Sequence, residues 1–199
     1  MERMTGASER TITEAYQAAL LFLRERHGLG WGVTGGKYAG DSIAKFLQEH
    51  PEVQTILDYG CGSASLKEWV EEKGITDRNW TLYDPGVRKY KQNPVGKFDL
   101  VITTDVLEHV EEIMLNKVLD HLHKLTGKFL YSEIACYLTN QVFEGGPYTG
   151  QDLHINMKAP DSWVKRLQHR DFTSIKYKIT LPEGWKVRCL LIQERIRDE

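Results

Sequence analysis

The chain has 199 residues, of which 41% are hydrophobic and 10% aromatic. This length and hydrophobic content suit one well-buried α/β core and are too small for two substantial domains. The formal net charge is −2 with 27% charged residues, so a strongly basic footprint is missing, and nucleic acid is not indicated as a partner, although a local basic patch stays compatible with that total.

The first fifty residues predict a helical lead-in. Apolar positions recur at helical spacing over Thr11 to His27, and Thr11 or Thr13 can cap the start of this helix. A glycine-rich connector over residues 30–38 follows, and a second, short helix is expected over Ser42 to His50.

Two features suggest the compartment of the protein. The longest early apolar stretch, Ala18 to Leu23, is far shorter than the ~20 residues of a membrane span. It also lacks the flanks and cleavage site of a signal peptide, so no membrane association is expected. The three cysteines (Cys61, Cys136 and Cys189) show no paired CxxC spacing, which favours reduced thiols and a cytoplasmic location.

From residue 53 onward, strands and helices alternate. Strands are expected at Val53–Asp58, Trp80–Asp84, Phe98–Thr103, Lys128–Ile134, Phe172–Leu181 and Trp185–Arg195, and helices at Ser65–Lys73, Val110–Leu125 and Pro160–His169. The short turn between the last two strands requires antiparallel pairing. The predicted fold class is α/β: an open, mostly parallel Rossmann-like sheet with helices on both faces and a C-terminal antiparallel hairpin. We expect one domain over residues 1–199, with a lead-in at 1–50 and a core at 53–196.

The end of the first strand carries the strongest chemical signal. Asp58 precedes a glycine turn that contains Gly60 and Gly62, and Asp84 ends the second strand. This is the first half of a nucleotide-binding α/β unit. A carboxylate at Asp58 would repel the pyrophosphate of a dinucleotide, but it would attract the sulfonium and ammonium groups of S-adenosylmethionine. The turn also lacks the third glycine of GxGxxG, so an NAD-dependent oxidoreductase is the lesser alternative.

Three segments together resemble class I S-adenosylmethionine-dependent methyltransferases, of the small-molecule type. They are Ile56-Leu57-Asp58-Tyr59-Gly60-Cys61-Gly62, the strand-end Asp84, and Phe98-Asp99-Leu100-Val101 leading to Asp105-Val106-Leu107-Glu108-His109-Val110. The resemblance spans about Val53 to Leu191. It implies S-adenosylmethionine as the cofactor and methyl transfer as the reaction.

The chain departs from this family at two places. The third loop glycine of the family is Ala64 here, a change that a loop without positive φ should tolerate. Only thirteen residues separate Asp84 from Phe98, too few for the helix and strand that the family has there. We therefore expect a shortened sheet, in which the residues that flank adenine are either missing or replaced by Tyr90 or Val95.

The resemblance also implies which residues bind the methyl donor: Asp58, Gly60, Cys61, Gly62, Asp84, Pro85, Asp105 and Val106. Asp58 is expected to contact the methionyl ammonium, directly or through water. Asp84 fits the ribose diol, since a carboxylate accepts two hydroxyl hydrogen bonds at once. Asp105 lies at the carboxyl edge of the sheet and either lines the donor site or caps the next helix.

Two histidines are the candidate catalytic residues. His154 lies in the long loop Thr139 to Ala159, which should cover the site, and His109 follows the third strand. Either can serve as a general base, because histidine takes up a proton near neutral pH. The alternatives are a surface histidine for His154 and a packing role for His109. Trp163 is a candidate wall of the same pocket.

Several other polar residues have weaker assignments. Glu133 is either a paired structural charge or a substrate contact, and Lys37 is a candidate contact to the donor carboxylate. The remaining histidines are interpreted as surface residues: His27, His50, His121, His123 and His169. His121 and His123 have no evident third ligand, so no metal site is expected.

The function predicted from the sequence is methyl transfer from S-adenosylmethionine to an oxygen or nitrogen of a small or medium-sized acceptor. The alternative is a catalytically silent S-adenosylmethionine-binding scaffold or partner subunit. The pattern carries no signal for an oligomeric state.

Overall fold

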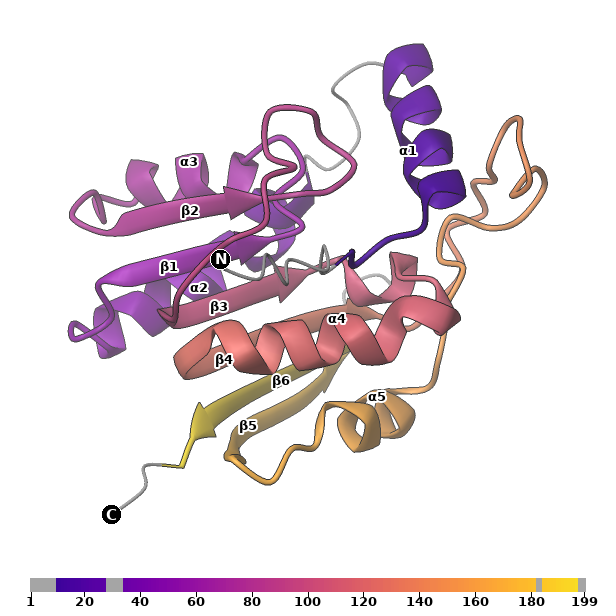
Figure 1. The fold of residues 1–199 in the computed structure, drawn as a ribbon. Coiled ribbons are helices and arrows are strands. Elements are labelled where there is room, and N and C mark those ends of the chain that lie inside the picture. The colour runs from indigo at the N-terminus through magenta and orange to yellow at the C-terminus, as the bar shows by residue number, and fades with distance from the viewer. Residues whose placement is uncertain (1–9, 28–33, 182–183, 197–199) are drawn as a thin grey trace, which may run out of the picture.

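A single sheet of six strands organises the chain in the computed structural model, which describes residues 10–27, 34–181 and 184–196 (Figure 1). The strand order is β2-β1-β3-β4-β6-β5. The strands are β1 Thr55–Tyr59, β2 Asn79–Tyr83, β3 Phe98–Thr104, β4 Thr126–Ala135, β5 Phe172–Thr180 and β6 Arg188–Arg195. Strands β1 to β4 pair in parallel, and β6 is antiparallel to both of its neighbours. The predicted fold class is confirmed.

Helices cover both faces of this sheet. They are α1 Glu14–His27, α2 Thr34–Glu49, α3 Ser65–Glu72, α4 Glu112–Leu125 and α5 Pro160–Leu167, with a short 3₁₀ helix η2 at Leu107–His109. Leu57 and Val101 pack with α4 and α5 on one face, whereas Ile56 and Leu100 pack with α2 and α3 on the other. Alternate residues of the central strands thus enter opposite cores, which is why these strands are apolar throughout.

The second helix is longer than the sequence suggested. It begins at Thr34 rather than Ser42, so the last part of the expected connector is helical, while residues 30–33 lie outside the described residues. Helix α2 packs against α3 at Gly40, where a Cβ would lie 2.3 Å from the Trp69 ring. Gly40 therefore serves the packing of the two helices.

The helix expected from Val110 begins two residues later, at Glu112, because Leu107–His109 form the separate 3₁₀ turn. On its inner face, His121 and His123 are each only 5% exposed, so the prediction that they are surface residues was wrong. His121 Nδ1 lies 3.1 Å from the Tyr59 hydroxyl, and this hydrogen bond satisfies a polar group in an apolar layer.

The segment between β2 and β3 is short, as expected. Residues 84–97 contain turns but neither helix nor strand, and β2 forms the edge of the sheet. Backbone bonds hold the segment, with the Asp84 and Tyr90 amides donating to the carbonyls of Tyr90 and Val87 at 2.9 Å each. The helix and strand that the resembling family has between the second and third strands are therefore absent from residues 84–97.

Helix α1 and the loop between β4 and α5 pack together at the carboxyl ends of the parallel strands (Figure 1). Their contact is a small cluster of apolar side chains: Tyr16, Ala19, Leu23, Phe143 and Leu153. Thr13 caps the helix, accepting a hydrogen bond from the Tyr16 amide at 3.1 Å. Thr11, the other cap candidate, bonds the Tyr83 hydroxyl instead. None of the helices in the described ranges has the length and apolarity to cross a membrane.

Candidate active site

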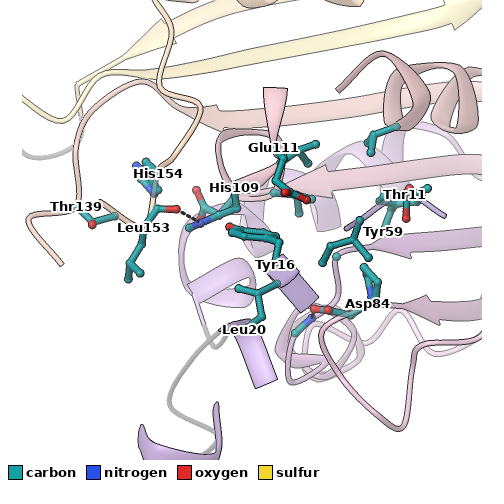
Figure 2. A pocket seen from close by; sticks show the side chains of 18 of the residues that line it. Thr11, Tyr16, Leu20, Tyr59, Asp84, His109, Glu111, Thr139, Leu153 and His154 are labelled. Atoms are coloured by element: carbon teal, nitrogen blue, oxygen red, sulfur yellow. Dashed lines mark hydrogen bonds between the residues drawn. The ribbon is translucent and has the colours of Figure 1, made fainter. Parts of the chain in front are cut away.

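A cavity of roughly 450 Å³ opens at the carboxyl edge of the sheet (Figure 2). Its walls come from the turns after β1, β2 and β3, from the loop after β4, and from α1. This is the place where open α/β sheets bind ligands, because the turns at the strand ends diverge there.

The cavity brings together most of the residues predicted for the site. Those that line it are Gly60, Gly62, Asp84, Pro85, Asp105, Val106, His109 and His154. Asp58 and Cys61 do not line the cavity; Asp58 is buried just before the glycine turn, and Cys61 is buried within it. Burial, followed by the charge of Asp58, raises the pKa of the Cys61 thiol, so this thiol is not a nucleophile.

The glycine turn is shaped by close approach. Gly60 has φ +85°, and a Cβ there would lie 2.3 Å from Cγ2 of Val106. Gly62 also has a positive φ, of 53°. Ala64 has φ 68°, so the expectation that this position avoids positive φ was wrong. Alanine is tolerated, at an energetic cost, in a conformation that glycine adopts freely.

Asp84 organises the second part of the site. Its Oδ2 accepts hydrogen bonds from the Gly62 amide at 3.0 Å and from Arg24 at 3.2 Å, and its Oδ1 accepts from the Gly86 amide at 2.8 Å. The carboxylate is therefore fixed against the glycine turn. Arg24 belongs to α1 and lies sixty residues away in sequence, so no local pattern pointed to it.

Asp58 is a buried carboxyl group whose two oxygens are not both hydrogen-bonded within the described part of the chain. It is 3% exposed, and its Oδ2 has no hydrogen-bond partner among the described residues. Burial raises its pKa to about 7, and the negative charge of Asp84 adds to this shift. A positively charged ligand group near this carboxyl would favour its ionised form.

Two imidazoles lie at the other end of the cavity. His109 Nδ1 donates to the Leu153 carbonyl at 2.8 Å (Figure 2). His154 Nδ1 donates to the Tyr137 carbonyl. Burial lowers the pKa of His109 to about 4 and also lowers the pKa of His154, so both rings are neutral at pH 7. Each ring therefore keeps a lone pair on Nε2.

Sequence reasoning missed Tyr16 and Glu111, which also line the cavity. Glu111 accepts hydrogen bonds from the Thr13 amide at 3.0 Å, the Thr13 hydroxyl at 2.8 Å and the Tyr148 hydroxyl at 2.5 Å. Tyr16 was detectable, since Tyr16, Ala19 and Leu23 share helical spacing on the buried face of α1. Glu111 had no such signal.

Several weaker predictions are now placed. Trp163 is fully buried in the core below α5, so the structure contradicts its assignment as a cavity wall. Tyr90 and Val95 do not line the cavity, and Val95 is 88% exposed. The side chain of Lys37 lies outside the described part of the chain.

Arg188 settles the roles of two acidic residues. It pairs with Glu133 at 2.7 Å and with Asp105 at 2.6 Å, so Glu133 is a paired structural charge. Asp105 does not cap α4, whose first turn has no side-chain cap. It lines the cavity instead, with φ 54°.

The family comparison agrees with this geometry. The family described as "Methyltransferase domain" matches residues 33–177, which is most of the chain. The chain therefore belongs to this family, and the resemblance to class I S-adenosylmethionine-dependent methyltransferases is confirmed at the level of family and fold. No curated protein matches the chain.

Many solved structures share the fold, among them the following three. The 1,6-didemethyltoxoflavin-N1-methyltransferase of Burkholderia thailandensis, with bound 1,6-didemethyltoxoflavin and S-adenosylhomocysteine, is 15% identical (TM-score 0.62; 92% of this chain and 89% of that chain covered). Magnesium protoporphyrin IX methyltransferase from Synechocystis PCC 6803, with bound S-adenosylmethionine, is 18% identical (TM-score 0.55; 84% of each chain). The plantazolicin methyltransferase BpumL, in complex with a triazolic desmethylPZN analogue and S-adenosylhomocysteine, is 11% identical (TM-score 0.58; 92% of this chain and 97% of that chain). At sequence identities of 11–18%, the similarity to these structures shows a shared fold and nothing more specific.

Proposed function

We propose that this protein transfers a methyl group from S-adenosylmethionine to an oxygen or nitrogen of a small or medium-sized acceptor. One observation carries the proposal: a single cavity joins the glycine turn and Asp84 at one end to two neutral imidazoles at the other. Family membership supports it, as do the S-adenosylmethionine, the S-adenosylhomocysteine and the 1,6-didemethyltoxoflavin bound in structures with the same fold.

The residues at the glycine turn fit this donor. The unpartnered Oδ2 of Asp58 suits the methionyl ammonium, reached through water because Asp58 does not line the cavity. Gly60 leaves its backbone bare at the cavity wall, where a Cβ would lie 2.3 Å from Cγ2 of Val106. Asp84 would hold the ribose hydroxyls, which would share its oxygens with Arg24. When bound, the donor supplies a methyl group already activated by a positively charged sulfur.

The chain itself would then align the acceptor and handle its proton. His154 and His109 would accept that proton at Nε2, since each Nδ1 is already committed to a backbone carbonyl. Helix α1 and the loop after β4 cover the cavity and would limit access of water.

Calorimetry with S-adenosylhomocysteine tests donor binding. Wild type should bind, and Asp84→Ala should bind at least tenfold more weakly, because a charged hydrogen bond contributes about 1.5–3 kcal/mol. Asp120→Ala, which removes an exposed carboxylate on α4, is the matched control and should bind normally. Failure of wild type to bind either S-adenosylmethionine or S-adenosylhomocysteine would overturn the proposal.

Turnover tests the acceptor end of the cavity. In an assay of S-adenosylhomocysteine release across a mixed panel of acceptors, His154→Ala should lower turnover by about 10²–10⁴-fold, the usual range for a general base. Its donor affinity should remain close to wild type. Unchanged turnover would remove His154 from the mechanism, and donor binding without any product would favour the scaffold alternative.

A further inference from the structure

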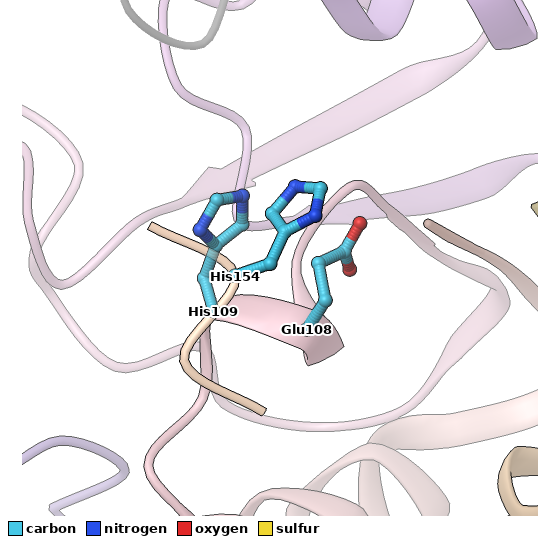
Figure 3. A group of neighbouring side chains, drawn as sticks. All are labelled: Glu108, His109 and His154. Carbon is cyan, nitrogen blue, oxygen red and sulfur yellow. The ribbon is translucent and has the colours of Figure 1, made fainter. Parts of the chain in front are cut away.

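Three side chains at the acceptor end form a cluster with the composition of a metal site. Glu108, His109 and His154 each offer one ligand atom, and these atoms all lie within 4.8 Å of one another. Figure 3 shows Glu108 and His109 projecting from η2 beside His154, which comes from the loop after β4. The two imidazole rings are 4.8 Å apart between centroids and nearly perpendicular, at 77°.

Glu108 supplies an independent indication of a ligand. Its side chain is 0% exposed, and Oε1 accepts a hydrogen bond from the Ala135 amide at 2.8 Å. Oε2 is buried and has no hydrogen-bond partner among the described residues. A buried carboxylate oxygen left in this state costs several kcal/mol, on the order of an unpaired polar group in an apolar medium. A cation at the cluster would compensate it.

The histidines are oriented as metal ligands commonly are. Because backbone carbonyls accept only, the Nδ1 atoms of His109 and His154 carry the protons, which fixes both tautomers, so each ring would coordinate through the lone pair of Nε2. Outer partners of this kind orient ligating imidazoles in known metal sites. The loop after β4 is also fixed against η2, since the Asn156 amide donates to the Glu108 carbonyl at 2.9 Å.

We propose that Glu108, His109 and His154 bind one divalent transition-metal ion. Two imidazoles and a carboxylate suit Zn²⁺, Mn²⁺ or Fe²⁺, whereas Mg²⁺ and Ca²⁺ prefer sites made of oxygen ligands. Asp105 borders the same cavity, and its negative charge beside the cluster is paired with Arg188. This departs from the sequence-based expectation of no metal, which had considered only His121 and His123.

The location of the ion would narrow the class of acceptor, an extension that rests on the proposed function. His109 and His154 both line the cavity, so the open coordination positions would face the acceptor. A hydroxyl group, or two neighbouring oxygens, would complete the coordination, and a metal ion lowers the pKa of a bound hydroxyl. The acceptor would then be an oxygen nucleophile, and the histidines would act through the ion rather than accept the proton themselves.

Metal binding can be measured without any methyl donor. The chain of 199 residues, freed of metal by dialysis against a chelator, is titrated calorimetrically with Zn²⁺, Mn²⁺ and Mg²⁺ in turn. We expect wild type to bind one Zn²⁺ or Mn²⁺ per chain, and Mg²⁺ more weakly. Glu108→Gln and His154→Gln should bind at least about tenfold more weakly. His50→Gln, which removes a half-buried histidine outside the cluster, should match wild type.

Folding and donor binding are read on the same samples. Glu108→Gln keeps the size of the side chain and an acceptor for the Ala135 amide, and His109→Gln provides a second variant at a less buried position. Circular dichroism and S-adenosylhomocysteine binding identify variants that have unfolded. Wild type that binds no ion, or variants that bind as tightly as wild type, would overturn the metal site. If S-adenosylhomocysteine still binds, that result leaves the proposed function intact.

Discussion

Single residues with unusual backbone conformation gather around the cavity. Gly60, Ala64 and Asp105 all have positive φ, at 85°, 68° and 54°, and all follow β1 or β3. For residues other than glycine this conformation costs about 1–2 kcal/mol. Strain of this kind persists where the surrounding structure determines the backbone, which is common at ligand sites.

Gly60 and Gly74 allow the steric and conformational parts of this cost to be separated. Both have φ +85°, but a Cβ at Gly74 would meet nothing within 4 Å, whereas at Gly60 it would collide with Val106. Gly74→Ala should lose about 1–2 kcal/mol of unfolding free energy in urea. Gly60→Ala should lose about 1–3 kcal/mol more, from overpacking. Equal losses in the two variants would mean that the contact with Val106 is unimportant.

At the level of elements, the cover of the cavity depends on one carboxylate. Glu111 precedes α4 and accepts hydrogen bonds from Thr13 at the start of α1 and from Tyr148 in the loop after β4. The two covering elements are thus tied to the same point, and their apolar cluster is small. We infer that these two covering elements, α1 and the loop after β4, unfold locally at a lower free energy than the strands of the sheet.

Hydrogen exchange tests this coupling. Glu111→Ala should weaken the cover by about 1–3 kcal/mol, the cost of leaving its buried partners unpaired. Amides of α1 and of residues 139–153 should exchange faster, and those of β3 and β4 should be unchanged. Glu112→Ala is the matched control, because this neighbouring glutamate pairs instead with Lys158 and Arg166. Faster exchange throughout the sheet would contradict the idea of a separate cover.

At the level of the whole molecule, Arg188 links three strands at the carboxyl edge. It lies on β6, pairs with Glu133 on β4, and reaches Asp105 after β3. Its side chain is only 4% exposed, so the two acidic partners depend on it for compensation. The antiparallel strand is therefore part of the site: its arginine holds Asp105 in the cavity wall.

Urea denaturation measures how much Arg188 contributes to the free energy of unfolding. Arg188→Met should cost about 3–5 kcal/mol of unfolding free energy, because it leaves the buried charge of Glu133 without its ion-pair partner. The double variant Arg188→Met, Glu133→Gln should recover part of that loss, since the charge is removed together with its partner. A double variant no more stable than the single one would show that packing, rather than charge, dominates.

The sequence by itself determined the strand-turn-helix unit at Asp58, the acidic end of β2 and the shortened segment after it. These features are local: apolar alternation, glycine turns and chain length constrain neighbouring residues directly. It also placed His109 and His154 near one site, since parallel strands present their carboxyl ends at one edge. Tertiary structure alone decided that Arg24 holds Asp84, that Glu111 holds α1 and the loop after β4 together, and that Glu108 lies beside His154. Such contacts join residues tens of positions apart, and they form because packing and buried charge compensation select their partners, which no periodic pattern in one sequence records.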